Sequence, residues 1–212
     1  MRIKLIGLIG VVAAALPVWG QTMQPVTTRA FDNSRSGANT HETILTRDNV
    51  VAKGIRRVTI IPVFGDARGT ESQPLILPGV KLKDGSTHDV MILPSMANIV
   101  HGVDAETGAA LWQTSLGRPI NGGVAIDMHQ INDHWGVEYR RHRPDTKRVY
   151  LVAWISPHVC VLDIADGALV VPPVSLVNAK SGTQRFASAM RKQRSSLVMT
   201  NGMEWTGLPS EL

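Results

Sequence analysis

Residues 102–112, G-V-D-A-E-T-G-A-A-L-W, decide the interpretation of this chain, because a related stretch, V-L-D-I-A-D-G-A-L-V-V, follows at residues 161–171. The two stretches share an aspartate, at Asp104 and Asp163, which lie 59 residues apart. In both, a glycine and a return to apolar residues follow the aspartate. Such self-similarity within one chain indicates a structural repeat.

Two further pairs of segments recur at about the same period. D-G-S-T-H-D-V-M-I-L at 84–93 resembles D-T-K-R-V-Y-L-V-A-W at 145–154, at an offset near 61 residues. P-L-I-L-P-G-V at 74–80 resembles S-L-V-M-T-N-G-M at 196–203, at an offset of about 122 residues, which is two periods. The three matched features recur in the same order along the chain, and this agreement is stronger evidence for a repeat than any single match. A period near 60 residues exceeds the usual blade length of roughly 40–50 residues, and we assign the excess to loops.

Each repeat predicts a run of short strands joined by tight turns. The Val-rich segments favour strands, and Asp-Gly at 84–85 and Thr-Gly at 107–108 favour turns that need positive φ. The Asp104 carboxylate can accept backbone N–H bonds across its turn, and Gly108 can adopt the left-handed conformation. After residue 20, no stretch keeps a helical apolar period for three turns. The fold class is therefore all-β, with four-stranded sheets of a β-propeller or a related repeat.

Composition excludes several classes of protein. The chain has 212 residues, a net charge of +5, 43% hydrophobic residues and one cysteine. A single cysteine excludes an internal disulfide framework, a Cys-rich zinc module and a C-x-x-C-H haem attachment. Cys160 stands among Val159, Val161 and Leu162, which favours a buried packing residue over a nucleophile.

The first twenty residues are typical of a secretory signal peptide. Arg2 and Lys4 precede an uncharged apolar run at 5–19, and we expect cleavage between Gly20 and Gln21. The alternative, a membrane anchor, is disfavoured because the run is shorter than the about twenty residues of a spanning helix. No cysteine follows it, which excludes a lipoprotein anchor at that point. The mature chain is expected to be periplasmic or secreted, without a stable membrane span, and too mildly basic to bind nucleic acid.

The pattern formed by Asp104, Thr107, Gly108 and Trp112 resembles the pyrroloquinoline-quinone (PQQ) repeat of quinoprotein-type β-propellers. In that family the tryptophan ends the last strand of a blade and lies flat against the neighbouring blade, where its indole N–H finds a partner on a loop. The family usually has alanine two residues before the aspartate, whereas this chain has Gly102. The resemblance covers about residues 70–202.

The second copy of the motif is weaker. Asp163 and Gly167 are kept, whereas Asp166 replaces the threonine and Val171 replaces the tryptophan. We interpret the six residues that match the motif, four in the first copy and two in the second, as residues that build blades. These are Asp104, Thr107, Gly108, Trp112, Asp163 and Gly167.

The repeats divide the chain into a signal peptide, an extended segment, two blades and the start of a third blade. Because two blades do not close a ring, we expect an N-terminal fragment of a longer propeller. The expected boundaries are 1–20, 21–72, 73–135, 136–194 (a diverged repeat) and 195–212 (a truncated repeat).

Two segments depart from the repeat. Residues 137–144, V-E-Y-R-R-H-R-P, stand where an apolar strand is expected, and a strand with that basic cluster would bury charge or lose its pairing. We interpret the segment as diverged or as locally frame-shifted. Residues 203–212, M-E-W-T-G-L-P-S-E-L, fit no strand pattern, which leaves the same two explanations.

The resemblance implies PQQ with Ca²⁺ as the cofactor of an active relative, but no residue of that site can be carried over, so catalytic and cofactor-binding residues stay unknown. We expect an exported binding or scaffold module whose partners are another protein or the missing blades. One alternative is part of a PQQ-dependent alcohol or sugar dehydrogenase, which requires that the propeller be completed elsewhere. The other alternative is a degenerate, inactive fragment.

Other polar residues give weaker patterns, and we assign no metal site. Each has a simpler interpretation as a surface, turn or loop residue. They are the oxygen donors Glu71, Asn98 and Asp127, the cluster His129, Asp133 and His134, and the basic runs at 140–148 and 191–194.

Overall fold

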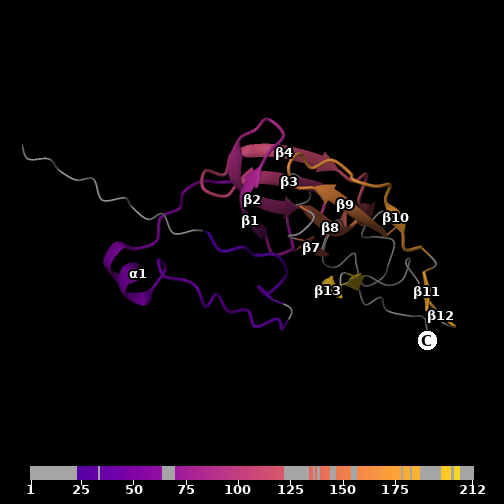
Figure 1. The fold of residues 1–212 in the computed structure, drawn as a ribbon, viewed down its shortest axis with the longest axis horizontal. Coiled ribbons are helices and arrows are strands. Elements are labelled where there is room, and N and C mark those ends of the chain that lie inside the picture. Colours follow the sequence, from indigo (N-terminus) through magenta and orange to yellow (C-terminus); the bar gives the residue numbers. More distant parts are fainter. Residues whose placement is uncertain are drawn as a thin grey trace, which may run out of the picture.

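The computed structural model is mostly β, and its two largest elements are four-stranded antiparallel sheets (Figure 1). The expected signal peptide lies outside the residues that the structure describes. These are residues 23–32, 34–63, 70–121, 134–135, 137, 139–143, 147–153, 157–177, 179–181, 183–186, 197–201 and 203–205.

The first sheet is a meander in which each strand pairs with the next along the chain. Its strands are β1 (Leu75–Lys81), β2 (Thr87–Pro94), β3 (Ile99–Asp104) and β4 (Ala110–Ser115), in the order β1-β2-β3-β4. The predicted turns join them: Gly85 has φ 90° between β1 and β2, and Gly108 has φ 76° between β3 and β4.

The second sheet repeats the same meander. Its strands are β7 (Tyr139–Arg143), β8 (Arg148–Ala153), β9 (His158–Asp163) and β10 (Val174–Ser175), in the order β10-β9-β8-β7. Strands β8 and β9 correspond to β2 and β3 at the period seen in the sequence. The last strand is reduced to two residue pairs, Val174 with Val159 and Ser175 with His158.

Both sheets contribute to one hydrophobic core. Buried and less buried residues alternate in most of β1 and in β9, as in half-buried strands, whereas five consecutive residues of β3, from Val100 to Asp104, are buried. The first sheet supplies Leu75, Leu77, Val90, Ile92 and Val100. The second sheet supplies Val149, Leu151, Cys160 and Leu162, and the turn after β9 adds Ile164. The sheets therefore pack against each other instead of forming separate units.

In the described part of the chain, three short two-stranded antiparallel pairs accompany the sheets. They are β5 (Ile120–Asn121) with β6 (His134–Trp135), β11 (Lys180–Ser181) with β12 (Gln184–Arg185), and β13 (Val198–Thr200) with β14 (Met203–Trp205). The expectation that 203–212 fits no strand is wrong for Met203–Trp205, because these residues pair with β13 across a tight turn at Asn201, whose φ is 50°.

The basic segment at 137–144 also keeps a strand, which corrects the expected loss of pairing. Five residue pairs join β7 to β8, from Tyr139 with Val152 to Arg143 with Arg148. Strand β7 is the edge of its sheet, where charged residues are tolerated because only one side of the strand is paired. Val137, just before the strand, is fully buried and anchors the segment to the core.

Among its described residues, the segment before β1 carries a helix that the sequence did not indicate. It is α1 (Arg47–Lys53), with Thr46 accepting a bond from the Asn49 N–H at its start and Gly54 at its end. No residue of α1 is buried, so it lacks the apolar face that sequence analysis detects. Among the described residues, none of the helices has the length and apolar character needed to cross a bilayer.

Candidate functional site: the contact between the two sheets

The Asp104 carboxylate organises the turn between β3 and β4. Its Oδ1 accepts hydrogen bonds from the Thr107 N–H at 2.7 Å, the Thr107 hydroxyl at 2.8 Å and the Glu106 N–H at 3.1 Å. The Gly108 N–H donates to the Asp104 carbonyl at 2.8 Å, with Gly108 in the left-handed region. One short acidic side chain thus satisfies the donors that a tight turn leaves open.

The turn that follows β9 has the same construction. The Gly167 N–H donates to the Asp163 carbonyl at 2.8 Å, and Gly167 has φ 72°. Asp163 Oδ1 accepts from the Ala165 N–H at 2.8 Å. Asp166 stands in the place of the threonine and makes one of the same hydrogen bonds. Asp166 Oδ1 accepts the Ala168 N–H at 3.0 Å, as the Thr107 hydroxyl accepts the Ala109 N–H at 3.2 Å. The two turns therefore share their geometry although the residues differ.

Trp112 on β4 connects the first sheet to this second turn. Its indole N–H donates to the Ile164 carbonyl at 3.0 Å. A Cβ on Gly167 would lie 2.3 Å from the Cε3 of Trp112, so the ring lies directly against the Gly167 backbone. Large rigid rings with a satisfied N–H are effective anchors between packed surfaces.

Gly102 leaves room for the Trp112 ring on its own sheet. It is directly opposite Trp112 in the β3–β4 pairing, and a Cβ there would lie 2.2 Å from the ring. The indole is thus held between two residues that both lack side chains, Gly102 in its own sheet and Gly167 in the next. Alanine at 102 would displace the ring from this position.

Two further interactions join the sheets beside the indole. The Thr114 hydroxyl donates to the Gly167 carbonyl at 2.6 Å. Lys83, which follows β1, forms an ion pair with Asp166. The side chains of this contact pack together and satisfy each other's polar groups, so they hold the two sheets against each other.

The second Asp104 oxygen has a partner that the sequence pattern did not indicate. His88 Nδ1 on β2 donates to Asp104 Oδ2 at 2.7 Å. Val90 lies opposite Asp104 in the sheet, so His88 is its diagonal neighbour, and such neighbours interact across antiparallel strands. The hydrogen bond from His88, followed by those of the Asp104 turn, lowers the pKa of Asp104 from 3.8 to about 2.

This depressed pKa predicts how stability depends on pH. Because the carboxylate is favoured in the folded state, its contribution is present above the unfolded pKa of 3.8 and is lost as pH falls through about 2. When the pH is lowered from 5 to 2, the free energy of unfolding of the native chain should fall by about 2 kcal/mol more than that of the Asp104→Asn variant. Parallel stability curves for the two proteins in chemical denaturation would contradict this.

Cys160 is buried, as predicted, and 2% of its surface is exposed. Burial raises the pKa of its thiol from 9.0 to about 11. We expect its reaction with a disulfide reagent at pH 8 to be at least about a hundredfold slower in the folded than in the unfolded chain, because the thiolate is the reactive form. Equal rates would show that the thiol is exposed.

The remaining candidates do not form a site among the described residues. Asn98 is fully buried, and its side-chain amide donates to the Arg118 carbonyl at 3.2 Å. Glu71 is exposed. Outside the described residues, or without a described side chain, lie Asp127, His129, Asp133, His134 and the basic runs at 140–148 (in part) and 191–194.

A Ca²⁺ cradle of the kind that the PQQ resemblance implies does not fit the described residues. They bring together no group of three or more histidine, cysteine, aspartate or glutamate side chains that could hold a metal ion. Asp104 and Asp163, the acidic residues of the repeat, have their Oδ1 atoms occupied by turn N–H groups.

The chain thus belongs to the class of mostly β proteins with repeated antiparallel sheets. No protein-family model matches its sequence, and no curated protein matches it. Among solved structures it is similar to BamB from Moraxella catarrhalis, with 16% sequence identity and a TM-score of 0.37. The similarity covers 64% of this chain and 43% of that protein, so this chain spans less than half of its length.

Proposed function

We propose that the chain is an exported β-propeller repeat module of two blades with a binding or scaffold role. The observation that supports this most strongly is the indole of Trp112, held between the sheets against a copy of its own turn. In a propeller each blade buries one face against the next, so this contact is what a blade-to-blade interface requires. The charged and apolar run at 1–20 supports export.

The outer edge of the second sheet supports a further partner. It exposes four large apolar side chains within nine positions, and we name them the edge patch: Leu169, Val171, Val174 and Val177. The corresponding edge of the first sheet carries Trp112, which packs against the core. Since exposed apolar side chains beside an unpaired sheet edge can mark an interaction site, we propose that another sheet of the same repeat type covers the edge patch.

Site-specific crosslinking tests this role. A photoreactive amino acid at Val174 should capture, from cells or periplasmic extract, a chain that mass spectrometry identifies as carrying propeller repeats. Val51 on α1 is the matched control, because it is also an exposed valine (80% against 59% for Val174) but lies outside both sheets. No product at Val174, or the same products at both positions, would contradict the proposal.

The edge patch also predicts self-association of the purified chain. Light scattering should show oligomers that grow with concentration, because an open β edge and an apolar patch are both exposed. The double variant Val171→Glu, Val174→Lys should remain monomeric. A native chain that is a stable monomer with a cooperative thermal transition would contradict this prediction.

The dehydrogenase alternative has a direct test of its own. Addition of PQQ and Ca²⁺ to the purified chain should give no saturable change in quinone absorbance, because the described residues assemble no ligand set for the metal. Saturable binding, or dye reduction with an alcohol or sugar, would overturn the scaffold proposal in favour of the enzyme.

A further inference from the structure

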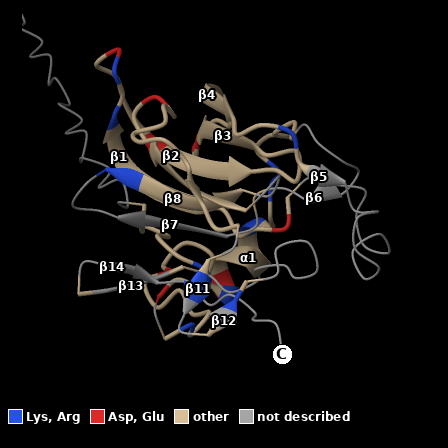
Figure 2. Cartoon of the chain, turned by 90° about the vertical axis from the view of Figure 1, so that its right-hand side faces the viewer, with Lys and Arg blue, Asp and Glu red and all other residues tan. Residues whose placement is uncertain are grey.

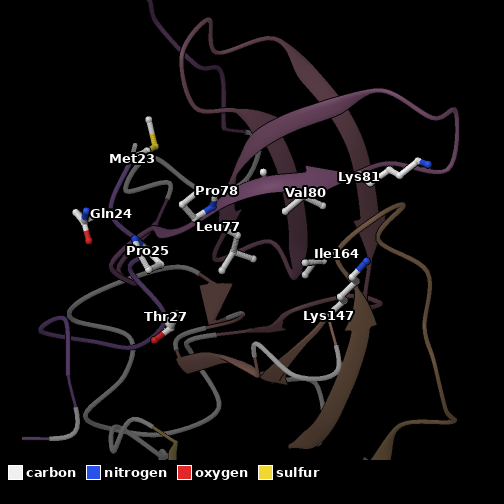
Figure 3. Close-up of a pocket in the computed structure, with 11 residues that line it drawn as sticks. Met23, Gln24, Pro25, Thr27, Leu77, Pro78, Val80, Lys81, Lys147 and Ile164 are labelled. Atoms are coloured by element: carbon white, nitrogen blue, oxygen red, sulfur yellow. The ribbon is translucent and has the colours of Figure 1, made fainter. Parts of the chain in front are cut away.

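A cavity of about 510 Å³ lies beside β1, between the N-terminal residues 23–27 and the turns of the second sheet (Figure 3). Its volume falls in the range of small-molecule sites. Its walls are mostly apolar, with Leu77 and Val80 on β1 and Ile164 in the turn after β9. The N-terminal wall is held in place by Val26, which exchanges two backbone hydrogen bonds with Ile76, at 2.8 and 3.0 Å.

A bulge in β1 shapes this wall. Leu77 pairs with Val90, but Val80 pairs with His88, so the strand holds one residue more than its partner between these pairs. In a regular strand, residues three apart point to opposite faces. The extra residue turns both Leu77 and Val80 toward the interior, where both line the cavity.

The residues of the bulge suit this geometry. Pro78 has no N–H to lose from the sheet, and Gly79 has φ 62°. The Gly79 N–H donates to Asp89 Oδ1 at 2.8 Å, which replaces the missing ladder bond. The bend in β1 is therefore a defined feature of the sequence.

One end of the cavity is cationic. Lys81 and Lys147 both line it on the side opposite Met23 and Pro25; in Figure 3 the Lys147 ammonium group lies on the side of Ile164, and the Lys81 side chain extends outward from the end of β1. Figure 2 shows basic residues at the end of β1 and the start of β8 next to each other. Among the described residues, no carboxylate forms an ion pair with either lysine. The nearby lysine that does form one is Lys83, which pairs with Asp166.

We propose that this cavity binds a single-chain fatty carboxylate. The alkyl chain would lie along the apolar wall formed by Leu77, Val80 and Ile164. The carboxylate would lie at the end that carries Lys81 and Lys147, where charge-assisted hydrogen bonds fix its orientation. An apolar cavity with a few convergent polar groups at one end is the general form of such sites. This inference goes beyond the scaffold role and does not depend on it.

The experiment is a titration of the purified full chain with dodecanoate, below its micelle concentration, followed by calorimetry. We expect saturable binding with one molecule per chain. Octanoate should bind more weakly, by about fourfold for each buried methylene that it lacks. Dodecyltrimethylammonium, which has the same chain and the opposite charge, should show no saturable binding.

Variants locate the site. Lys81→Gln combined with Lys147→Gln should weaken dodecanoate binding about tenfold, since hydrogen bonds between charged groups are the strong ones. Both side chains are exposed, so these changes should leave folding intact. Lys53→Gln, at the end of the exposed helix α1, is the matched control and should bind as the native chain does.

Three results would overturn the proposal. They are non-saturable uptake of dodecanoate, equal affinity for the cationic detergent, and unchanged affinity in the Lys81, Lys147 double variant. Each would assign the binding to general adsorption on exposed apolar side chains. The residues of the edge patch do not line the cavity. The Val171→Glu, Val174→Lys variant, which should no longer bind a partner at the edge patch, should therefore bind dodecanoate with unchanged affinity.

Discussion

Replacement of Trp112 by alanine is expected to lower the free energy of unfolding by about 3 kcal/mol. The ring packs against the shared core, and its N–H bond to the Ile164 carbonyl would also be lost. The expected loss lies at the lower end for aromatic truncations because the residue is only partly buried. Denaturant unfolding, followed by far-ultraviolet circular dichroism, measures it.

Trp112→Phe is the matched control for the ring itself. It keeps an aromatic side chain but removes the indole N–H, so we expect a loss of about 1 kcal/mol from the hydrogen bond, with a further contribution from the smaller ring. If the alanine variant lost well under 1 kcal/mol, the indole would not be acting as a wedge between the sheets.

Replacement of Gly167 by alanine should cost about 3 kcal/mol for a different reason. The residue has φ 72°, where side chains are strained by about 1 kcal/mol. The new methyl group would also meet the Trp112 ring at 2.3 Å and the Thr114 hydroxyl at 2.7 Å, and overpacking of this kind costs about 1–3 kcal/mol.

Gly117→Ala separates the two effects. Gly117 also has a positive φ, 94°, but nothing lies within 4 Å of the position that its Cβ would take. We expect only the backbone strain of about 1 kcal/mol. Equal losses for the two glycine variants would show that Gly167 makes no tight contact with the indole.

The sequence predicted the parts of the fold that depend on local chemistry. Asp104 and Gly108 mark a turn because a short carboxylate and a residue that tolerates positive φ are what that turn requires, and the strands on either side follow from their Val-rich pattern. The regular period then placed the second sheet, since Asp163 and Gly167 build the same turn 59 residues later.

Features that depend on contacts between residues far apart in the chain could not be predicted from the sequence. The basic segment of β7 is tolerated because it forms an edge, and edge position is a property of the whole sheet. His88 meets Asp104 only through strand register, and Lys83 meets Asp166 only through the packing of two sheets. Helix α1 depends on its Thr46 cap and has no buried face to signal it.

A double-mutant cycle between Trp112 and Gly167 tests most directly whether the two sheets pack through the indole. With tryptophan at 112, Gly167→Ala should cost about 3 kcal/mol. With alanine at 112 the clash with the ring is gone, so only the backbone strain and the contact with the Thr114 hydroxyl, together about 1–2 kcal/mol, should remain. The expected coupling free energy between positions 112 and 167 is therefore about 1–2 kcal/mol. Additive losses, with a coupling within the error of measurement, would contradict it.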